Sequence, residues 1–124
     1  MRALRRTALA ATLLVCTGSV LAAPDVVTQR EIDVLMDALQ GSHCRFQRNG
    51  SWYGEREARA HLQRKYDYLA KRNMIGSTEQ FIERAASRSS MSGKPYRIAC
   101  PGSPEQDASR WFGERLKQLR HPQR

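Results

Sequence analysis

Two cysteines far apart in the sequence constrain the fold more than any other feature. Cys44 and Cys100 are the pair that remains once an N-terminal secretion signal containing Cys16 is removed. In an oxidising compartment such a pair most often forms a disulfide. In the chain-entropy view, closing so long a loop stabilises a fold by about 4 kcal/mol. A metal pair or a reactive thiol is the alternative, but the two cysteines match no metal-binding spacing and no Cys-x-x-Cys motif.

The first of these cysteines introduces a predicted β-hairpin. Asn49-Gly50 stands between two strand-like runs and favours a type I′ turn, in which both central residues have positive φ. Side chains alternate along a strand, so Cys44 and Phe46 should share one face. A disulfide brings the Cα atoms of its cysteines within about 7 Å. We therefore expect the strand that contains Cys100 to lie beside or very near the first hairpin strand.

The N-terminus has the pattern of a secretory signal. Arginines occur early, and no charged residue follows from Thr7 to Pro24. A positive start, an apolar body and small residues before the cut define such signals. We place cleavage after Ala22, which gives a signal peptide at 1–22 and a single domain at 23–124. The mature protein would then be periplasmic and secreted, with no transmembrane segment after cleavage.

Two other interpretations of the N-terminus fit less well. An uncleaved anchor would need a longer apolar run, because this one is near the lower limit for crossing a bilayer. A lipoprotein attached at Cys16 would need a small residue before the cysteine, where Val15 stands.

Hydrophobic periodicity and capping signals predict four helices. The first starts at the capping box Thr28-Gln29-Arg30-Glu31 and stops at Gly41. The second follows Gly54, the third starts at Ser77, and the last starts at Ser103-Pro104-Glu105-Gln106, with proline in its first turn. Their apolar faces supply the expected core: Ile32, Leu35, Met36, Leu39, Ala58, Leu62, Tyr66, Leu69, Phe81, Ile82, Ala85, Ala86, Ala108, Trp111, Phe112, Leu116 and Leu119.

One further strand is predicted at Tyr96–Cys100, where apolar and polar residues alternate. With the hairpin it makes a three-stranded, at least partly antiparallel sheet in the order α-β-β-α-α-β-α. Helices must cover the apolar face of this sheet, so the predicted fold class is α+β with one disulfide. The stretch Ser87–Ser92, followed by Gly93 and Pro95, indicates the end of the third helix and a turn into this strand. A ligand-binding loop is the alternative.

Several phrases of the sequence together resemble a known family. They are Phe46-x-Arg48-Asn49-Gly50-Ser51-x-Tyr53, Ala60-His61-Leu62-x-x-Lys65-Tyr66, Glu79-Gln80-Phe81-Ile82 and Ala86-Ser87-x-Ser89-Ser90-x-Ser92-Gly93-Lys94-Pro95-Tyr96. As a set they look like the YfeK-like family of small secreted bacterial proteins of unknown function. The resemblance runs from about Ile32 to the helix that contains Trp111. It implies a periplasmic location and a shared fold, and it carries over no activity, cofactor or catalytic residue.

The chain is basic, with a formal net charge of +9. A positive field favours anionic partners, although a basic solvated surface is also an ordinary way to remain soluble. Basic residues interleaved with aromatic residues make the best candidate binding surface. That surface comprises Arg45, Arg48, Trp52, Tyr53 and Lys94. Aromatic residues that simply pack under the helices are the alternative. No nucleic-acid-binding signature occurs in the sequence, and such a role fits poorly with export.

Catalytic patterns have little support. The position three before Lys94 is Met91, so there is no Ser-x-x-Lys motif, and no Gly-x-Ser-x-Gly elbow occurs. Metal binding by His61 on a helix would need a ligand four residues later, where Lys65 stands. We therefore expect no metal and no cofactor, although a carboxylate pair assembled by folding stays open.

These observations favour a non-enzymatic periplasmic protein that binds an anionic envelope ligand or a protein partner. The alternative is a hydrolase of cell-envelope polymers that uses a serine from 87–92 together with His61. An inhibitor of a secreted enzyme is a third hypothesis, and its target would be acidic because the mature chain is basic.

Overall fold

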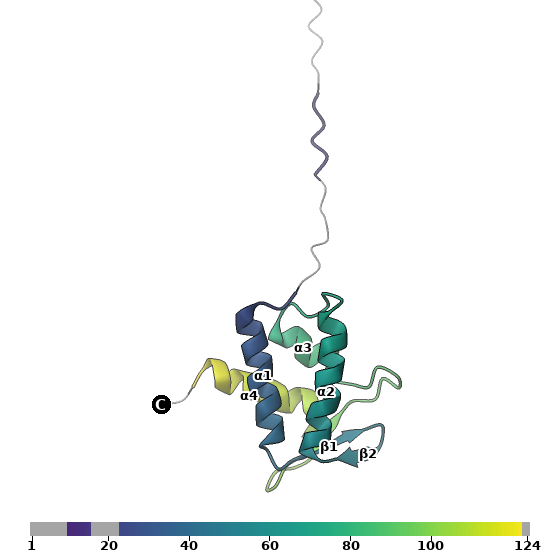
Figure 1. Ribbon diagram of the computed structural model, residues 1–124, viewed down its shortest axis with the longest axis vertical. Coiled ribbons are helices and arrows are strands. Elements are labelled where there is room, and N and C mark those ends of the chain that lie inside the picture. Colours follow the sequence, from purple (N-terminus) through teal and green to yellow (C-terminus); the bar gives the residue numbers. More distant parts are fainter. Residues whose placement is uncertain (1–9, 16–22, 123–124) are drawn as a thin grey trace, which may run out of the picture.

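Figure 1 shows a computed structural model of the protein, which describes residues 10–15 and 23–122. The regular elements of this part are α1 (Val26–Gln40), β1 (Arg45–Arg48), β2 (Ser51–Tyr53), α2 (Glu55–Ala70), α3 (Thr78–Arg84), β3 (Arg97–Ala99), β4 (Gln106–Asp107) and α4 (Ala108–Arg120). The fold class is α+β, as predicted. The predicted cleavage point after Ala22 lies outside the described residues.

The start of α1 differs from the predicted capping box. The cap is Asp25, whose carboxylate accepts a hydrogen bond of 2.7 Å from the backbone N–H of Thr28. A carboxylate at this position satisfies a backbone donor that the helix leaves unpaired. Glu31, which the prediction used as the reciprocal cap, is therefore free to bind elsewhere. The helix ends at Gly41, as expected.

The Asn-Gly turn is confirmed. Asn49 has φ 51° and Gly50 has φ 81°, so both central residues are in the left-handed region that a type I′ turn requires. Arg48 pairs with Ser51 across this turn, and Phe46 pairs with Tyr53. Directly paired residues share a face of a hairpin, and side chains two residues apart on a strand do too. This register therefore puts Phe46, Arg48 and Tyr53 on one face of the hairpin.

The disulfide joins the two halves of the sheet. Cys44 and Cys100 are bonded, with their Cα atoms 4.1 Å apart. The strand order is β2-β1-β3-β4, and every neighbouring pair is antiparallel. β3 therefore lies beside β1, as the cysteine pair predicts.

The sheet has four strands, and the prediction of three was wrong. Gln106–Asp107 forms β4, which pairs with β3, instead of the first turn of the last helix. The guanidinium of Arg97 on β3 donates to Asp107 at 2.7 Å and to Glu105 at 3.0 Å. These bonds hold the segment extended, so α4 begins only at Ala108.

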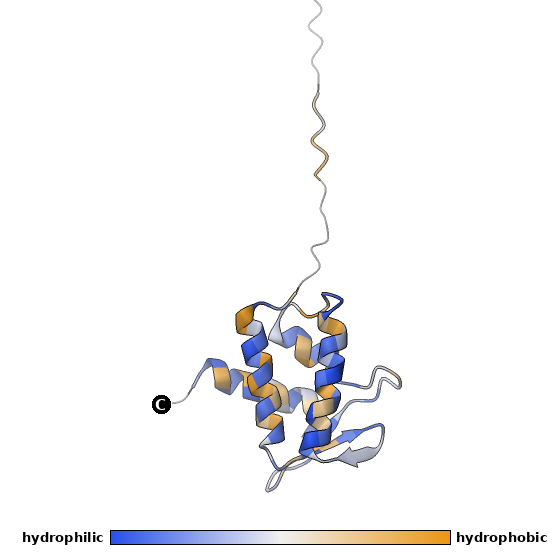
Figure 2. Cartoon of the chain, viewed as in Figure 1, coloured by the Kyte–Doolittle hydropathy of each residue, from blue (hydrophilic) through white to orange (hydrophobic). Residues whose placement is uncertain are grey.

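The core lies between the helices and one face of the sheet. In Figure 1, α1 and α2 stand side by side, α4 crosses behind them, and the β1–β2 hairpin lies at one end. Figure 2 shows polar and apolar residues mixed along the helices, as expected where each helix buries one face. The larger buried side chains are Ile32, Leu35, Met36, Leu39, Phe46, Leu62, Ile75, Phe81, Tyr96, Ile98, Trp111 and Phe112.

A few predicted core positions are less buried than expected. Tyr66, Leu69 and Ile82 are partly buried at the edge of the core, and Leu119 remains 38% exposed. Within the described residues, no helix is long and apolar enough to cross a membrane.

Candidate functional site

A polar cluster forms where the hairpin meets α2. Arg48 of β1 donates from Nη1 to Nδ1 of His61 on α2, at 3.0 Å. On the other side of the ring, Nε2 of His61 lies 3.0 Å from the hydroxyl of Tyr96, which precedes β3. The Nζ of Lys65 donates to the same hydroxyl oxygen at 3.2 Å and to the carbonyl of Arg88 at 2.6 Å. Four segments of the chain therefore meet at this cluster.

The donors and acceptors of the cluster fix its protonation pattern. Arginine has no acceptor atom, so Nδ1 of His61 must accept the bond from Arg48. The neutral ring then carries its proton on Nε2 and donates it to the oxygen of Tyr96. That oxygen also accepts a hydrogen bond from Nζ of Lys65. The hydroxyl proton of Tyr96 is therefore available to an acceptor outside the cluster.

The positive charges in the cluster act on each other's protonation. Burial, together with the charges of Arg48, Lys65 and Arg64, lowers the pKa of His61 to about 4. Burial also lowers the pKa of Lys65, and Arg48 and Arg88 add to this effect. Burial raises the pKa of Tyr96, although Arg48 opposes this. At neutral pH the imidazole and the phenol are therefore uncharged, while the guanidinium groups keep their charge.

A pocket of about 420 Å³, which we call the central pocket, opens beside this cluster. Its walls come from the hairpin, α2 and the 88–95 turn. Among the described residues that line it, none is acidic. Its lining includes Arg48, His61, Arg64, Lys65, Ser90 and Tyr96.

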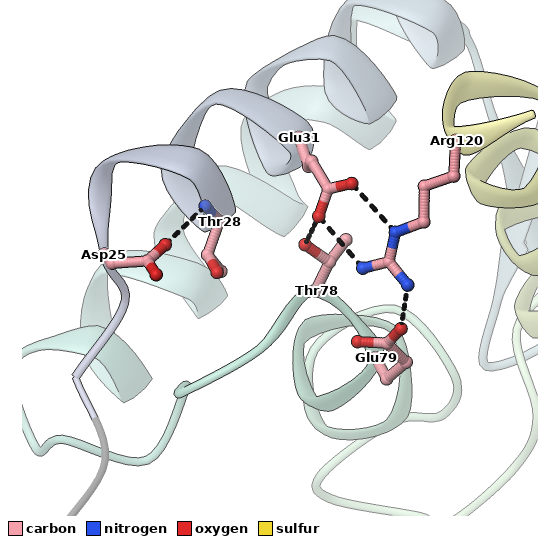
Figure 3. Close-up of polar contacts among 6 residues, drawn as sticks. All are labelled: Asp25, Thr28, Glu31, Thr78, Glu79 and Arg120. Carbon is pink, nitrogen blue, oxygen red and sulfur yellow. Dashed lines mark hydrogen bonds and ion pairs between the residues drawn. The ribbon is translucent and has the colours of Figure 1, made fainter.

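Several arginines elsewhere in the molecule are paired with carboxylates. Figure 3 shows Arg120 of α4 bound to Glu31 and Glu79, while the hydroxyl of Thr78 donates to Glu31 at 2.7 Å. Arg59, Arg97 and Arg110 also have carboxylate partners. Of the ion pairs found among the described residues, by contrast, none involves a cation of the central pocket.

This arrangement suits the binding of an anion. Arg64 and Lys65 offer charged donors, the Tyr96 hydroxyl offers a neutral donor, and charge-assisted hydrogen bonds are the stronger kind. An incoming negative charge would also relieve the mutual repulsion of the cations. The described residues bring together no group of three histidine, cysteine, aspartate or glutamate side chains that could hold a metal ion.

The same geometry gives little support to a serine nucleophile. Both ring nitrogens of His61 are engaged by Arg48 and Tyr96, so the ring has no free lone pair to activate a hydroxyl. Ser89 is buried, and its oxygen accepts from the backbone N–H groups of Met91 and Ser92. These bonds shape a turn, as predicted for the stretch Ser87–Ser92.

A family model described as "Family of unknown function (DUF5329)" matches residues 26–120. The chain belongs to this family. The match covers every helix and strand of the domain, including all residues of the central pocket. The expected resemblance to a YfeK-like family of unknown function is thereby confirmed.

One curated relative of this DUF5329 member is the uncharacterized protein YfeK of Salmonella typhimurium. The two chains are 41% identical over 69 residues, which is 55% of this chain and 56% of the relative. The alignment therefore spans about half the length of each protein. No solved structure matches this chain.

The structure separates the predicted binding residues of this DUF5329 protein. Arg48 lines the central pocket, and its guanidinium lies 5.2 Å from the centre of the Tyr53 ring. Arg45 lies 6.0 Å from the Trp52 ring, and the strand register puts both on the opposite face of the hairpin. Lys94 is exposed on the 88–95 turn and is not among the residues that line the central pocket.

The predicted binding surface did not include Arg64, Lys65 or Tyr96, which line the central pocket. Arg64 and Lys65 follow His61 by three and four residues, which places all three on neighbouring positions of one helix face. That spacing was a usable signal for a basic face. Tyr96 carried no such signal, because an apolar strand position describes it equally well.

Proposed function

We propose that this protein is an exported, non-enzymatic binding protein that holds an anionic group of a cell-envelope component in its central pocket. The observation that carries the proposal is the lining of that pocket, where Arg48, Arg64 and Lys65 face a cavity with no acidic lining residue in the described chain. Basic groups without carboxylate partners in a concave site favour a negatively charged ligand.

The cluster supports binding rather than catalysis. General base catalysis at neutral pH needs a group with a free lone pair and a pKa near the working pH. His61 has its pKa lowered to about 4 and both nitrogens hydrogen-bonded. The pKa of Tyr96 is raised, so its hydroxyl stays protonated and donates a hydrogen bond; it does not act as a base. What remains is a set of fixed donors that can hold an anion in place.

Two features support export. The N-terminal sequence has a positive start followed by an uncharged run from Thr7 to Pro24. The Cys44–Cys100 disulfide suits an oxidising compartment such as the periplasm. An envelope component is therefore the anion source that a protein of this kind would meet.

Co-sedimentation tests the proposal. The oxidised protein is mixed with purified cell-wall and lipopolysaccharide fractions at low and high salt, and the bound fraction is measured in the pellet. Binding at low salt that weakens at high salt is expected, because salt screens partly exposed charges. No sedimentation with either fraction at either salt would contradict the proposal and direct attention to a protein partner.

A matched pair of variants on α2 locates the binding. Arg64 and Arg56 are both exposed arginines of this helix, but only Arg64 lines the central pocket. Arg64→Gln should lower the bound fraction, and Arg56→Gln should leave it close to that of the wild type. Equal losses in both variants would show that net charge, and not the pocket, carries the contact.

A further inference from the structure

The hydrogen-bonding capacity that the central pocket leaves unused consists mostly of donors. The ammonium group of Lys65 has three N–H groups, and two of them are used on the carbonyl of Arg88 and the oxygen of Tyr96. Arg48 has five N–H groups, of which the hydrogen bonds found in the described chain use one, on His61. Tyr96 keeps its hydroxyl proton, because its oxygen already accepts two bonds. These side chains can therefore donate several further bonds to a ligand.

The two turns beside the pocket add uncharged donors. Ser89 is buried, and its oxygen accepts two backbone N–H bonds, so its hydroxyl proton also remains to be donated. Ser90 is exposed and lines the same pocket. Asn49 accepts from Ser92 through Oδ1, which leaves the N–H groups of its amide. A ligand in the pocket would therefore meet donors from the hairpin, from α2 and from the 88–95 turn.

The cations of this region lie close enough to affect one another. Burial is the main cause of the lowered pKa of Lys65, and the charges of Arg48 and Arg88 add to it. Arg64 lines the same pocket, and within the described chain it has no carboxylate partner. A ligand with one negative charge would leave much of this positive charge uncompensated, whereas a dianion would compensate more of it.

A phosphate monoester matches both the donors and the charge. It carries about −1.5 to −2 charges at pH 7 and presents three strong acceptor oxygens. A carboxylate has a single charge and only two oxygens. A sulfate ester has three terminal oxygens but again a single charge. Charge-assisted hydrogen bonds from arginine and lysine are the stronger kind, so the doubly charged acceptor gains most from this lining.

We infer that the central pocket recognises the dianion of a phosphate monoester, with Arg64 and Lys65 as cationic contacts and the hydroxyl of Tyr96 as a neutral one. This inference rests on the proposed function, since it uses the same pocket for the anionic group. It adds the chemical class of that group, which lipid headgroups and phosphorylated sugars share.

Isothermal titration calorimetry of the oxidised protein with three sugars tests the inference. Glucose 6-phosphate, glucose 6-sulfate and glucuronic acid have the same ring and differ in the anionic group. At about pH 7.5, glucose 6-phosphate is expected to bind about tenfold more tightly than either of the others. At about pH 5 its advantage over the sulfate should shrink to about twofold, because the second pKa of a phosphate ester is about 6 and the group is then mostly a monoanion.

The sulfate ester controls for titration of the protein itself. The charged and titratable groups that line the pocket are Arg48, His61, Arg64, Lys65 and Tyr96. His61, with a pKa of about 4, is mostly neutral at both pH values. Arg88, Glu57 and Glu83 line neighbouring pockets. The charge of a sulfate ester is constant over this range, so a change in any protein group would also appear in the binding of glucose 6-sulfate.

Vesicles distinguish the two sources of the group. Phosphatidylcholine vesicles that contain phosphatidic acid, a phosphate monoester, are compared by co-sedimentation with vesicles of equal total charge that contain phosphatidylglycerol, a diester. Preference for phosphatidic acid would support the inference and assign the group to a lipid headgroup. Tight binding of glucose 6-phosphate without that preference would support the inference and assign the group to a sugar.

The contrary results are distinct. If the three sugars bind equally, or if the sulfate or the carboxylate binds most tightly, the inference fails while the proposed function stands. If glucose 6-phosphate keeps its full advantage at about pH 5, the pocket does not read the second charge and the inference fails. If none of the sugars and neither kind of vesicle binds, both the inference and the anion site are overturned.

A pair of variants on α2 tests the charge argument. The attraction between a ligand and a fixed cation scales with the charge of the ligand. Arg64→Gln should therefore weaken glucose 6-phosphate by about tenfold and glucose 6-sulfate by about threefold at about pH 7.5. Arg56→Gln, at an exposed arginine that does not line the central pocket, should leave both affinities close to those of the wild type. Equal losses for the two esters in Arg64→Gln would contradict recognition of a dianion.

Discussion

At the scale of single residues, the ring of His61 joins a cation to a phenol, and protonation of the ring would break this bridge. Nδ1 accepts from Arg48, so a second proton on the ring would remove the only acceptor and add a charge beside Lys65 and Arg64. Burial of the ring is the main reason why the pKa of His61 falls to about 4, and the charges of Arg48, Lys65 and Arg64 add to the effect. Its two hydrogen bonds also keep Arg48 and Tyr96 turned toward the central pocket.

We expect the free energy of unfolding to decrease as the pH falls from about 7 to about 5. The ordinary pKa of His61 is 6.5 and its pKa in the fold is about 4. In this range the unfolded chain takes up a proton that the folded chain refuses, so acid favours unfolding. After allowance for solvent screening of a half-buried ring, the loss is about 1–2 kcal/mol. Urea denaturation at several pH values measures it.

The His61→Gln variant is the control for this prediction. Glutamine can accept one hydrogen bond and donate another, as the neutral imidazole does, but it does not titrate. Its free energy of unfolding should therefore change much less over the same pH range. An equal decrease in the variant would assign the pH dependence to other groups.

At the scale of elements, the C-terminal end of α4 is attached to the rest of the fold by Arg120. Its Nε and Nη2 donate to the two carboxylate oxygens of Glu31 on α1, at 2.9 Å and 3.0 Å, and its Nη1 binds Glu79 on α3. These bonds lower the pKa of both carboxyl groups, with the hydrogen bond from Arg120 as the largest cause. The contribution is present above the ordinary carboxyl pKa and is lost as acid protonates them.

We expect Arg120→Gln to lower the free energy of unfolding by about 1 kcal/mol, because one bidentate and one single ion pair are lost at a partly exposed site. Arg110→Gln on the same helix removes only an exposed pair with Glu114 and should cost less than about 0.5 kcal/mol. Urea denaturation of the two variants at neutral pH compares them. Equal losses would show that the network joining three helices adds nothing beyond an ordinary surface pair.

Elements whose signals lie within a few neighbouring residues could be predicted. Elements that form only by pairing with a distant segment of the chain could not. A few neighbouring residues are enough to indicate the Asn49-Gly50 turn and the apolar stripes of the helices. β4 has only two residues and exists because Arg97 and the backbone of β3 hold it. The capping signal at 103–106 therefore pointed to the wrong element.

The same distinction explains the candidate site. Arg48 could be proposed because it sits in a hairpin with a clear signal, but its position relative to α2 depends on the whole fold. Tyr96, Lys65 and the 88–95 turn meet it only after β3 has paired with β1. Periodicity describes one element at a time, so it can indicate the basic face of α2 but not the cavity beside it.

At the scale of the whole molecule, the disulfide links residues 56 positions apart and ties the two halves of the sheet together. The double variant Cys44→Ala/Cys100→Ala should lower the free energy of unfolding by about 3–4 kcal/mol, because the unfolded chain regains the freedom that the closed loop denies it. Urea denaturation of the oxidised protein and the variant measures the difference. Wild-type protein kept reduced by dithiothreitol should match the variant; if the variant were as stable as the oxidised protein, the bond would have no thermodynamic role.

The central place of β1 in the sheet also determines when the protein can finish folding. One neighbour, β2, follows after a two-residue turn, but the other, β3, starts only at Arg97. A lone two-stranded ribbon is marginally stable in water, so an emerging chain keeps an unpaired edge until most of its length is available. Trp111 and Phe112, which close the core, arrive later still. A chain that cannot complete its fold early stays unfolded for longer, and an unfolded chain can be threaded end first through a narrow channel.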